Sequence, residues 1–491
     1  MAFEGGRASG PAGTVAVVGG GLSGTVFSLK LARARPDVKV VLIDDARRPG
    51  RGLAYGACAP RHLLNVPVSR METGLEPRFI DWLQTHAQTY RQALDAALAE
   101  SGGDLSAAFL PRALFGAYLE AQLATARETD ASTGVHVVRG RAVAALDDGR
   151  RGVRLEDGRA VEAGTVVLAL GNLPPTPPGR VDAWLYDTPL FTPDPWAAGA
   201  FDDLDPDAPV LLVGTGLTMV DVVLMLAERG HRGAMLAVSR HGLVPRLHQA
   251  GGAWPAFLND HIGETPLALL RRVRATVAAA EAEGVPWQRV FDAARPAVGA
   301  VWSRWSISER RQFVRHLRAR WDIHRHRTAP RVNAALQDLI DRGQLHIRAA
   351  RLAGFVIEDG QVATRLHLRG GGETRVTAGR IVNCTGPASA LDRLALPLIE
   401  SLRAQGLVKP DAMGLGLESS DCALMTAGGQ VSTWLFALGG LTRPAWWEIT
   451  ATPEIVVQID RLTARLASGD VAAPALVDDA TAAFIDLGAG I

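Results

Sequence analysis

Two glycine-rich segments, one in each half of the chain, constrain its fold more than any other feature. Residues 17–24 read VVGGGLSG, and residues 211–219 read LLVGTGLTM. Each segment follows an apolar run and precedes apolar residues at helical spacing, as expected where a strand turns sharply into a helix. One such turn is a weak signal. Two of them predict that one chain holds two nucleotides.

In the first segment each glycine has a separate physical role. Gly19 permits the tight turn out of the strand, Gly21 lets the backbone approach a pyrophosphate, and Gly24 lets the helix pack on the strand. Free amides at the start of the helix, around Leu22 and Ser23, would then face the phosphates. A glycine-rich turn that binds nothing is the alternative interpretation.

Two carboxylates follow at the end of the next β-branched run. Asp44 and Asp45 close residues 38–43, about 20 residues after the glycine turn. A carboxylate at this point can accept hydrogen bonds from the ribose hydroxyls of a dinucleotide. The spacing therefore predicts a βαβ unit that binds the ADP half of a cofactor.

The second segment departs from the pattern at its third glycine. Gly214 and Gly216 are kept and Leu217 and Thr218 begin the helix, but Met219 stands where the third glycine is expected. The larger side chain predicts a wider separation of helix and strand. A structural turn in a domain that has lost its nucleotide is the alternative.

The strand after the second turn ends in Ser239 and Arg240. An acidic residue at that position favours NADH, whereas an arginine and a serine suit the 2′-phosphate of NADPH. The second unit is therefore predicted to bind NADPH in preference to NADH.

The remaining pattern predicts an α/β fold with two Rossmann-like dinucleotide-binding domains, β-meanders and a helical insertion. Helical spacing is predicted over residues 77–99. Short β-branched runs separated by Asp-Gly-type turns follow each dinucleotide unit, and those of the first unit are residues 135–138, 142–146 and 152–155. Each half closes with an apolar strand that runs into a glycine, Gly171 or Gly386. Residues 255–340 are rich in Arg, Trp and Ala and lack strand-like alternation, so they are predicted to be helical.

Composition narrows the class of partner. The net charge of +1 gives no overall attraction to nucleic acid or anionic membrane, and no apolar run reaches the length of a membrane span. The three cysteines form no CxxC pair, which excludes a dithiol redox centre of the usual spacing. We expect a cytoplasmic protein with a small-molecule substrate and neither nucleic acid nor membrane as partner. Whether identical chains associate stays open.

The densest polar cluster lies at residues 321–327, which read WDIHRHR. His324 and His326 have no cysteine or second histidine pair near them in sequence, so no metal is predicted. Two other interpretations stay open for Arg325 and Arg327. They form a solvated or salt-bridged helix end, or they bind an anion such as a cofactor phosphate or a substrate carboxylate.

With these motifs the chain resembles the flavoproteins with two dinucleotide-binding domains. It is most similar to a bacterial FAD/NAD(P)-binding protein family related to the flavin-containing monooxygenases. The resemblance extends from residue 15 to about residue 459. The motifs that carry it are residues 52–55 (GLAY), 64–67 (LNVP), 111–112 (PR), 321–330 and 436–451.

The resemblance implies a split FAD-binding domain. The expected domains are residues 14–200 with 384–491 for FAD, residues 206–254 with 341–383 for NAD(P), residues 255–340 as the helical insertion, and residues 1–13 as a flexible N-terminus.

The resemblance also implies which residues lie near the flavin. Tyr55, Asn65 and Val66 would approach the isoalloxazine ring, while Gly439 and Gly440 would face the ribityl chain. The last helix would point its N-terminus at the flavin pyrimidine, where it stabilises negative charge. The full set expected at the two cofactors is Gly19, Gly21, Leu22, Ser23, Gly24, Asp44, Asp45, Gly52, Tyr55, Asn65, Val66, Gly171, Gly214, Gly216, Leu217, Thr218, Ser239, Arg240, Gly386, Gly439, Gly440 and Thr450.

The implied activity is an FAD-dependent oxidoreductase that takes hydride from NAD(P)H, preferably NADPH, and acts on a small organic substrate. One alternative is an N-, S- or Baeyer–Villiger-type monooxygenase that forms a C4a-hydroperoxyflavin. The linker Phe-x-Gly-x-x-x-His-x-x-x-Trp of such enzymes is missing, since residues 191–196 read FTPDPW. Another alternative is a flavin-bound partner protein with a non-functional nicotinamide site. No catalytic side chain is predicted, because the cofactors carry the chemistry.

Overall fold

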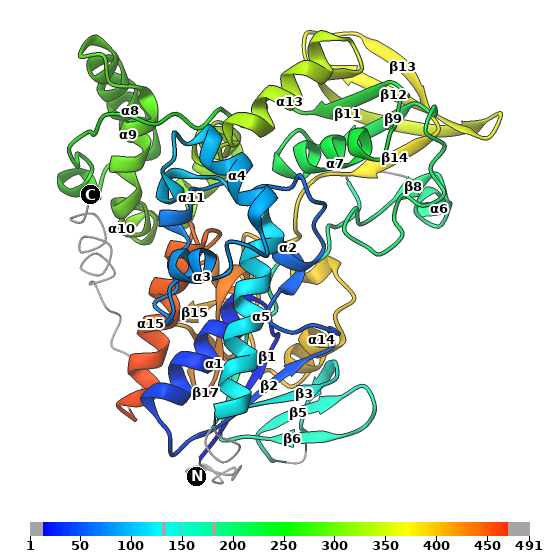
Figure 1. Ribbon diagram of the computed structural model, residues 1–491. Helices are drawn as coiled ribbons and strands as arrows, with labels where there is room; N and C mark the ends of the chain where they lie inside the picture. Colours follow the sequence, from blue (N-terminus) through cyan, green and yellow to red (C-terminus); the bar gives the residue numbers. More distant parts are fainter. Residues whose placement is uncertain (1–12, 130–133, 148, 179–182, 470–491) are drawn as a thin grey trace. The chain divides into compact units, whose positions relative to one another are not determined.

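The computed structural model describes residues 13–129, 134–147, 149–178 and 183–469, and it divides into two compact units (Figure 1). Unit 1 comprises the described residues of Met1–Gly56, Pro67–Leu173 and Ser389–Ile491, and unit 2 those of Ala57–Val66 and Pro174–Ala388. Residues 1–12 of the expected flexible N-terminus lie outside the described residues, as do residues 470–491. No helix in the described part of the chain is both long and apolar enough to cross a lipid bilayer.

Unit 1 is built on a seven-stranded sheet of order β15-β16-β17-β7-β1-β2-β3. Strands β17, β7, β1, β2 and β3 are parallel, and β15 and β16 extend one edge in antiparallel fashion. Their bounds are β1 Thr14–Val18, β2 Lys39–Asp44, β3 Val135–Arg139, β7 Thr165–Leu168, β15 Ser419–Ser420, β16 Ala423–Met425 and β17 Val431–Ala437.

Helix α1 (Leu22–Ala34) packs against α5 (Arg112–Thr129) and α15 (Thr452–Ala467) in front of this sheet (Figure 1). Unit 1 also contains α2 Gly52–Gly56, α3 Phe79–Thr85, α4 Arg91–Glu100 and α14 Pro397–Ala404. The single helix expected over residues 77–99 is therefore two helices, α3 and α4.

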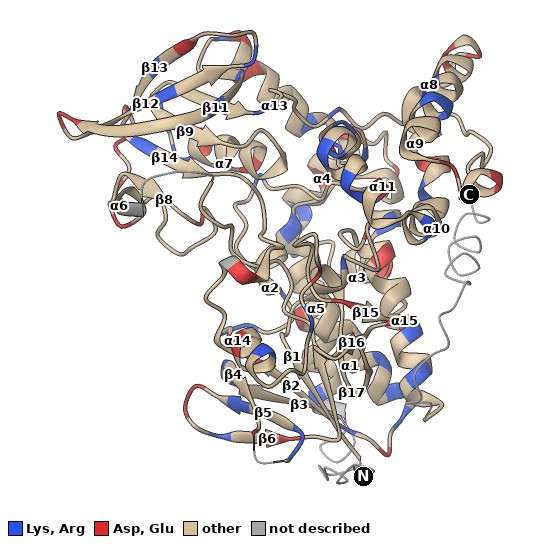
Figure 2. Ribbon diagram, turned by 180° about the vertical axis from the view of Figure 1, so that it is seen from behind, with Lys and Arg blue, Asp and Glu red and all other residues tan. Residues whose placement is uncertain are grey.

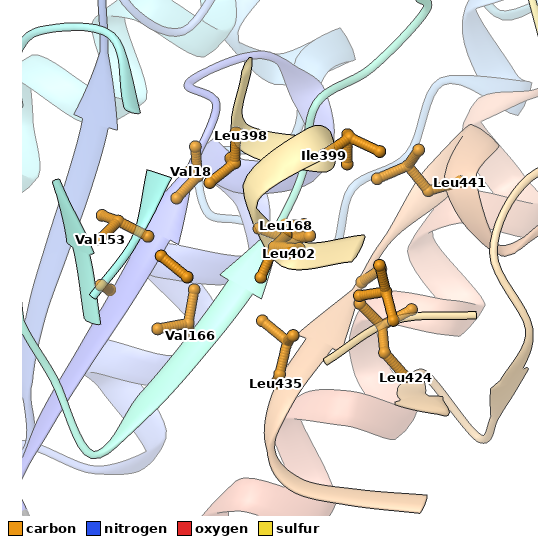
Figure 3. Packing of buried hydrophobic residues seen from close by; sticks show 14 of the residues in the cluster. Val18, Val153, Val166, Leu168, Leu398, Ile399, Leu402, Leu424, Leu435 and Leu441 are labelled. Atoms are coloured by element: carbon orange, nitrogen blue, oxygen red, sulfur yellow. The ribbon is translucent and has the colours of Figure 1, made fainter. Parts of the chain in front are cut away.

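A second sheet and α14 form the core on the other side of the strands. The second sheet consists of β4 (Ala142–Ala145), β5 (Gly152–Leu155) and β6 (Ala160–Glu162). Val153 from β5 and Leu398 and Leu402 from α14 pack with Val18 and Leu168 of the main sheet (Figure 3). Residues 135–138, which the sequence placed in this meander, instead pair with β2 in the main sheet.

Unit 2 contains the second seven-stranded sheet, of order β13-β12-β11-β10-β9-β14-β8. Strands β8, β14, β9, β10 and the start of β11 are parallel, and β11, β12 and β13 form an antiparallel meander. The bounds are β8 Phe191–Thr192, β9 Val210–Val213, β10 Met235–Ser239, β11 Leu345–Glu358, β12 Gln361–Leu368, β13 Glu373–Ala378 and β14 Arg380–Asn383. Helices α6 (Ala183–Tyr186), α7 (Leu217–Glu228) and α13 (Pro330–Asp341) accompany this sheet.

The predicted insertion is helical, and its last helix belongs to the sheet. The insert contains α8 Pro266–Ala282, α9 Trp287–Ala294, α10 Val298–Arg304, α11 Ile307–Gln312 and α12 Arg318–Arg325, with a π-helical turn at Phe313–Leu317. Helix α13 instead packs on α7 and β11. It supplies the crossover helix that a parallel connection into β11 requires.

The two units repeat one topology, which confirms the predicted α/β fold with two Rossmann-like domains. In unit 1, β1 lies between β2 and β7, and in unit 2, β9 lies between β10 and β14. In both units the first strand, β1 or β9, runs through a glycine turn into a helix. The neighbouring strand that comes later in the chain, β7 or β14, ends beside that turn. The architecture is therefore duplicated within the chain.

The compact units differ from the expected domain bounds in three places. Residues 174–200 belong to unit 2, because β8 pairs with β14. Residues 384–388 also belong to unit 2, because they continue directly from β14. Residues 57–66 are the third difference, since they belong to unit 2 and not to the unit with the first glycine turn. Within them, His62 Nε2 lies 3.0 Å from the carbonyl oxygen of Asp221 on α7.

Candidate dinucleotide-binding sites

The first glycine turn cannot accept larger residues at two of its positions. Gly19 has φ +107°, and a Cβ placed on it would lie 2.3 Å from the carbonyl oxygen of Ala169. A Cβ on Gly24 would lie 1.9 Å from the carbonyl oxygen of Gly19. Both distances are far below van der Waals contact, so the close approach of β1, β7 and α1 depends on these two glycines.

Asp44 closes the same turn from the end of β2. The amide of Gly20 donates to Asp44 Oδ2, and the amide of Ala46 donates to Oδ1 at 2.7 Å. A Cβ on Gly20 would lie 2.6 Å from Asp44 Oδ2. Asp45 is exposed and lies 3.4 Å from Arg141 Nε. Of the two predicted carboxylates, the structure brings only Asp44 to the glycine turn.

Gly21 lies against a second backbone segment. A Cβ on Gly52, which has φ +56°, would lie 2.8 Å from the Cα atom of Gly21. The amide of Gly50 donates to the carbonyl of Gly20 at 2.7 Å. The predicted residue Gly52 therefore holds its loop against the start of α1, and both glycines are needed for that close approach.

The N-terminus of α1 fits the pyrophosphate of FAD. Gly21 is its N-cap, and within the described residues no side chain caps this helix and no acidic residue stands in its first turn. The first amides of an uncapped helix carry partial positive charge and are satisfied by a bound anion. Leu22, Ser23 and Gly24 are buried at this end of the helix, and their contact with the phosphates stays a prediction.

Four predicted glycine and serine residues meet beside the same helix end. A Cβ on Gly439 would lie 3.4 Å from Ser23 Oγ, and a Cβ on Gly440 would lie 3.5 Å from the carbonyl oxygen of Gly171. Residues 439 and 440 start a 3₁₀ turn, Gly439–Thr442, directly after β17. The backbone of this turn is thereby placed next to the end of β7 and the start of α1.

A buried glutamine fixes the Gly439 turn, and sequence reasoning missed it. Gln458 on α15 is fully buried, and its Oε1 accepts from the Gly439 amide at 2.8 Å. Its Nε2 donates to Thr442 Oγ1 at 2.7 Å, and that hydroxyl donates to the Gly439 carbonyl at 2.9 Å. The polar groups of Gly439, Thr442 and Gln458 thus satisfy one another, which is the condition for a stable buried network.

Replacing Gln458 by leucine should destabilise unit 1 and loosen FAD. Leucine leaves the buried Gly439 amide without an acceptor, which should lower the free energy of unfolding by about 1–3 kcal/mol. Chemical denaturation of the FAD-loaded protein, together with the FAD dissociation constant, measures both effects. The control Gln312→Leu changes an exposed glutamine and should leave both values unchanged. Equal free energies of unfolding and equal FAD dissociation constants in the two variants would show that Gln458 does not stabilise the Gly439 turn.

Tyr55 reaches the start of the last helix. Its hydroxyl oxygen lies 3.3 Å from Thr452 Oγ1, and its ring packs edge-on against Phe115. Burial raises the pKa of the Tyr55 phenol, so it stays protonated at neutral pH. Helix α15 begins at Thr452, while the predicted residue Thr450 is exposed outside it. Thr452 is thus the threonine that the structure brings to Tyr55.

Asn65 and Val66 belong to unit 2, whereas the resemblance implied that they lie with the FAD-binding part of the chain. The segment is held in unit 2 by His62, which is buried. Its Nδ1 accepts from the Ala59 amide at 3.1 Å, so its Nε2 carries the proton that is donated to Asp221. A position of Asn65 and Val66 near the flavin stays a prediction.

The second glycine turn repeats the geometry of the first. Gly214 has φ +119°, and a Cβ on it would lie 2.2 Å from the carbonyl oxygen of Cys384, at the end of β14. Nothing lies within 4 Å of a Cβ on Gly216, the N-cap of α7, within the described residues. Met219 is fully buried, so the missing third glycine is accommodated inside the unit. Gly386 follows Cys384 with φ +85°.

The predicted Ser239 is already engaged in the local turn. Thr215 Oγ1 donates to the carbonyl oxygen of Leu243 and lies 2.8 Å from Ser239 Oγ. The Gly242 amide donates to Ser239 Oγ at 3.0 Å. Ser239 therefore shapes the loop after β10, and the positive charge for a phosphate has to come from other side chains.

Arginines gather around His241 next to this loop. Burial lowers the pKa of His241, and the positive charges of Arg369, Arg240, Arg320 and Arg351 lower it further. Arg369 Nη1 lies 2.9 Å from His241 Nδ1, so this arginine donates to a neutral imidazole. The end of β10 thus carries a concentration of cations, of which the sequence identified only Arg240. The others were missed because arginine is common throughout the chain and these four come from separate segments.

This arrangement predicts a pH dependence of cofactor binding. A phosphate bound beside His241 would raise the pKa that the arginines lower, so the complex takes up a proton. The affinity for NADPH should then increase as the pH falls from neutrality into the range where His241 takes up its proton in the complex. The measurement is the NADPH dissociation constant against pH in wild type and in His241→Gln. The histidine contribution is the difference between the two curves, and identical curves would contradict it.

No group of three or more His, Cys, Asp or Glu side chains within the described residues is placed to hold a metal ion. The WDIHRHR cluster ends α12 and contains two buried arginines, Arg325 and Arg327. The three cysteines are free, with Cys384 and Cys422 buried.

Residues 16–173 match a family model described as FAD-NAD(P)-binding. The matched segment ends where the first part of unit 1 ends, at Leu173. No curated protein sequence matches the chain. The family description agrees with the cofactors predicted from the two glycine turns.

Solved structures share the fold across nearly the whole chain. The reduced form of ornithine hydroxylase from Pseudomonas aeruginosa has a TM-score of 0.62 at 14% identity, and the alignment covers 93% of this chain and 99% of that one. The ornithine N-hydroxylase of Kutzneria sp. 744 gives 0.59 at 16% identity, over 92% and 100%. L-lysine 6-monooxygenase from Pseudomonas syringae gives 0.60 at 15% identity, over 93% and 98%.

The family model and the shared fold agree with the resemblance to flavoproteins with two dinucleotide-binding domains. Residues 16–173 match the FAD-NAD(P)-binding model, and the likeness to the solved structures shows that the chain has their fold.

Proposed function

We propose that this chain is an FAD-dependent oxidoreductase that uses NADPH as hydride donor and acts on a small organic substrate. The observation that carries the proposal is the repeated glycine turn. Gly19 and Gly214 have the same left-handed backbone and the same close approach to a neighbouring strand exit, and the helix after each turn has no side-chain cap from the described residues. Two such turns provide separate sites for FAD and for the nicotinamide cofactor.

The residues have distinct roles in this proposal. The amides at the start of α1 hold the FAD pyrophosphate, and Asp44 accepts from its ribose. Gln458 orients the Gly439 turn, and the N-terminus of α15 stabilises negative charge on the flavin. When bound, FAD accepts hydride from NADPH and passes electrons to a substrate or to oxygen.

NADPH is preferred over NADH because of the charges at the end of β10. Arg240 and Arg369 act on His241 together with two further arginines, and no acidic residue is among the charges that shift its pKa. A 2′-phosphate is strongly favoured at such a position. The alternative of a lost nicotinamide site rested on Met219. That side chain is buried in the core, and the start of α7 stays uncapped.

Steady-state oxidation of NADPH and NADH by the FAD-loaded protein in air tests this function. The proposal predicts turnover of both, with a markedly higher kcat/KM for NADPH. Turnover that occurs only with NADH would contradict the cofactor assignment, and no turnover with either would contradict the function. The cytoplasmic location and an association of identical chains stay predictions.

A monooxygenase is the second candidate, and the shared fold favours it. The three hydroxylating enzymes above have this fold over 92–93% of the chain. Mixing the NADPH-reduced protein with oxygenated buffer separates the candidates. A direct return of the oxidised flavin spectrum fits a reductase or dehydrogenase. A distinct, long-lived spectrum before that return fits a monooxygenase.

A further inference from the structure

The helical insert contains a charged centre that the proposed function does not use. Asp292 on α9 contacts two arginines through its two oxygens. Arg327 Nη2 donates to Oδ1, and Arg289 Nη2 lies 3.0 Å from Oδ2. We call Arg289, Asp292 and Arg327 the arginine centre. Figure 2 shows that basic residues recur along the helices of this insert.

The arginine centre has more positive than negative charge. Two guanidinium groups share one carboxylate, which leaves an excess of one positive charge within the three residues. Arg327 is only 6% exposed, and burial lowers the pKa of its guanidinium. The neighbouring charges of Arg289 and Arg325 lower that pKa further, although Asp292 opposes them. An excess charge that is removed from water strongly favours an anion beside it.

Both arginines also keep buried donors without a partner. Arg327 Nη1 and Arg289 Nε are inaccessible to solvent and have no hydrogen-bond acceptor within the described residues. A buried donor of this kind destabilises the protein while it stays unsatisfied. Because both guanidinium groups contact the same Asp292, the two donors belong to one location. An oxyanion is the ligand that would satisfy both.

Half-buried aromatic rings adjoin the arginine centre. Arg327 lies over the Trp287 ring with its Cζ 6.0 Å from the ring centroid. His324 stacks on Phe291 at 5.0 Å and meets Trp287 edge-on at 4.8 Å. Trp321 lies 5.4 Å from Phe291. All four rings are intermediate in exposure, and we call them the aromatic wall.

A carboxylate on an apolar or aromatic body fits this combination better than a phosphate. The carboxylate would take the donors of Arg289 and Arg327, and the body would lie on the aromatic wall. A nucleotide phosphate has no apolar body directly attached to it. The cations around His241 already provide for the phosphate of the proposed NADPH.

We propose that Arg289 and Arg327 bind the carboxylate of an organic acid in the helical insert. The inference rests on the proposed function for the idea that this acid is the substrate. Binding of the acid itself depends on neither FAD nor NADPH. Its experiment therefore gives an answer even where the proposed function fails.

Calorimetric titration of the FAD-loaded protein with benzoate tests the proposal, since benzoate is a small carboxylate on an aromatic body. Wild type should bind benzoate, and should bind benzamide and inorganic phosphate at least about tenfold more weakly. Arg327→Gln should weaken benzoate binding by about tenfold or more. Arg289→Gln, at a less buried position, provides the same test if the first variant fails to fold. The control Arg274→Gln removes an exposed arginine of α8 and should bind like wild type.

A variant that should strengthen benzoate binding complements the two arginine variants, which should weaken it. Asp292→Asn removes the carboxylate that competes for both arginines, so benzoate should bind more tightly and should raise the melting temperature more than in wild type. A merely structural ion pair predicts no gain in affinity. Absence of benzoate binding in wild type, binding that ignores both arginine variants, or equal binding of phosphate would overturn the proposal. If benzoate binds as expected while NADPH fails to reduce the flavin, carboxylate binding at the arginine centre is supported and the proposed function is contradicted.

Discussion

Gly24→Ala should yield protein that no longer retains FAD. A methyl group on Gly24 would lie 1.9 Å from the carbonyl oxygen of Gly19, and both atoms are backbone or attached directly to it. Helix α1 has to move away from β1, which displaces its amides from the pyrophosphate. Overpacking of this kind costs about 1–3 kcal/mol or more of folding stability. The ratio of flavin to protein absorbance after purification measures the effect on FAD.

Two further glycines serve as matched controls. A Cβ on Gly263 or Gly370 has no atom within 4 Å in the described structure, and neither residue has a positive φ. Gly263→Ala and Gly370→Ala should therefore retain FAD like wild type. Far-ultraviolet circular dichroism separates loss of FAD from loss of the fold. A folded Gly24→Ala protein with a full complement of FAD would show that α1 does not hold the cofactor.

The double variant Arg240→Gln, Arg369→Gln should raise the dissociation constant for NADPH by about 100-fold or more. Each charge-assisted hydrogen bond to a phosphate contributes about 1.5–3 kcal/mol, and 1.4 kcal/mol corresponds to about tenfold in affinity. The dissociation constant for NADH should stay within about twofold, because NADH lacks the 2′-phosphate. Titration of both cofactors in wild type and in the variant gives the comparison.

The ratio of the two constants separates a specific contact from general damage. A variant whose second unit is distorted loses NADPH and NADH together. The control Arg271→Gln removes one exposed positive charge from α8, and it should leave the ratio unchanged. Equal weakening of NADPH and NADH in the double variant would place the 2′-phosphate elsewhere.

Much of the fold was predictable from local sequence signals. The glycine turns at Gly19 and Gly214 identify themselves, because tight strand-to-helix turns require glycine at fixed spacing. The error at residues 135–138 has a physical reason. A short apolar strand has the same residue pattern whether it belongs to a meander or pairs with β2. Only its long-range pairing distinguishes the two positions. The same limit applies to α13, whose role in the crossover depends on β11.

Site residues that lie close together in the sequence were predictable. Site residues that the fold brings together from separate elements were not. Asp44 follows the first turn at a fixed distance, so the sequence identified it. Gln458 acts on Gly439 from a separate helix, and Arg369 acts on His241 from the far end of β12. Nothing in the neighbouring sequence of Gln458 or Arg369 marks either residue, since only the tertiary fold brings the partners together.

Anaerobic mixing of the FAD-loaded protein with one equivalent of NADPH tests whether one chain holds both a flavin and the nicotinamide that reduces it. We expect the oxidised flavin absorbance to be lost, faster with NADPH than with NADH. An oxidised spectrum that persists with both nicotinamides would contradict it, as would a protein that cannot be loaded with FAD at all.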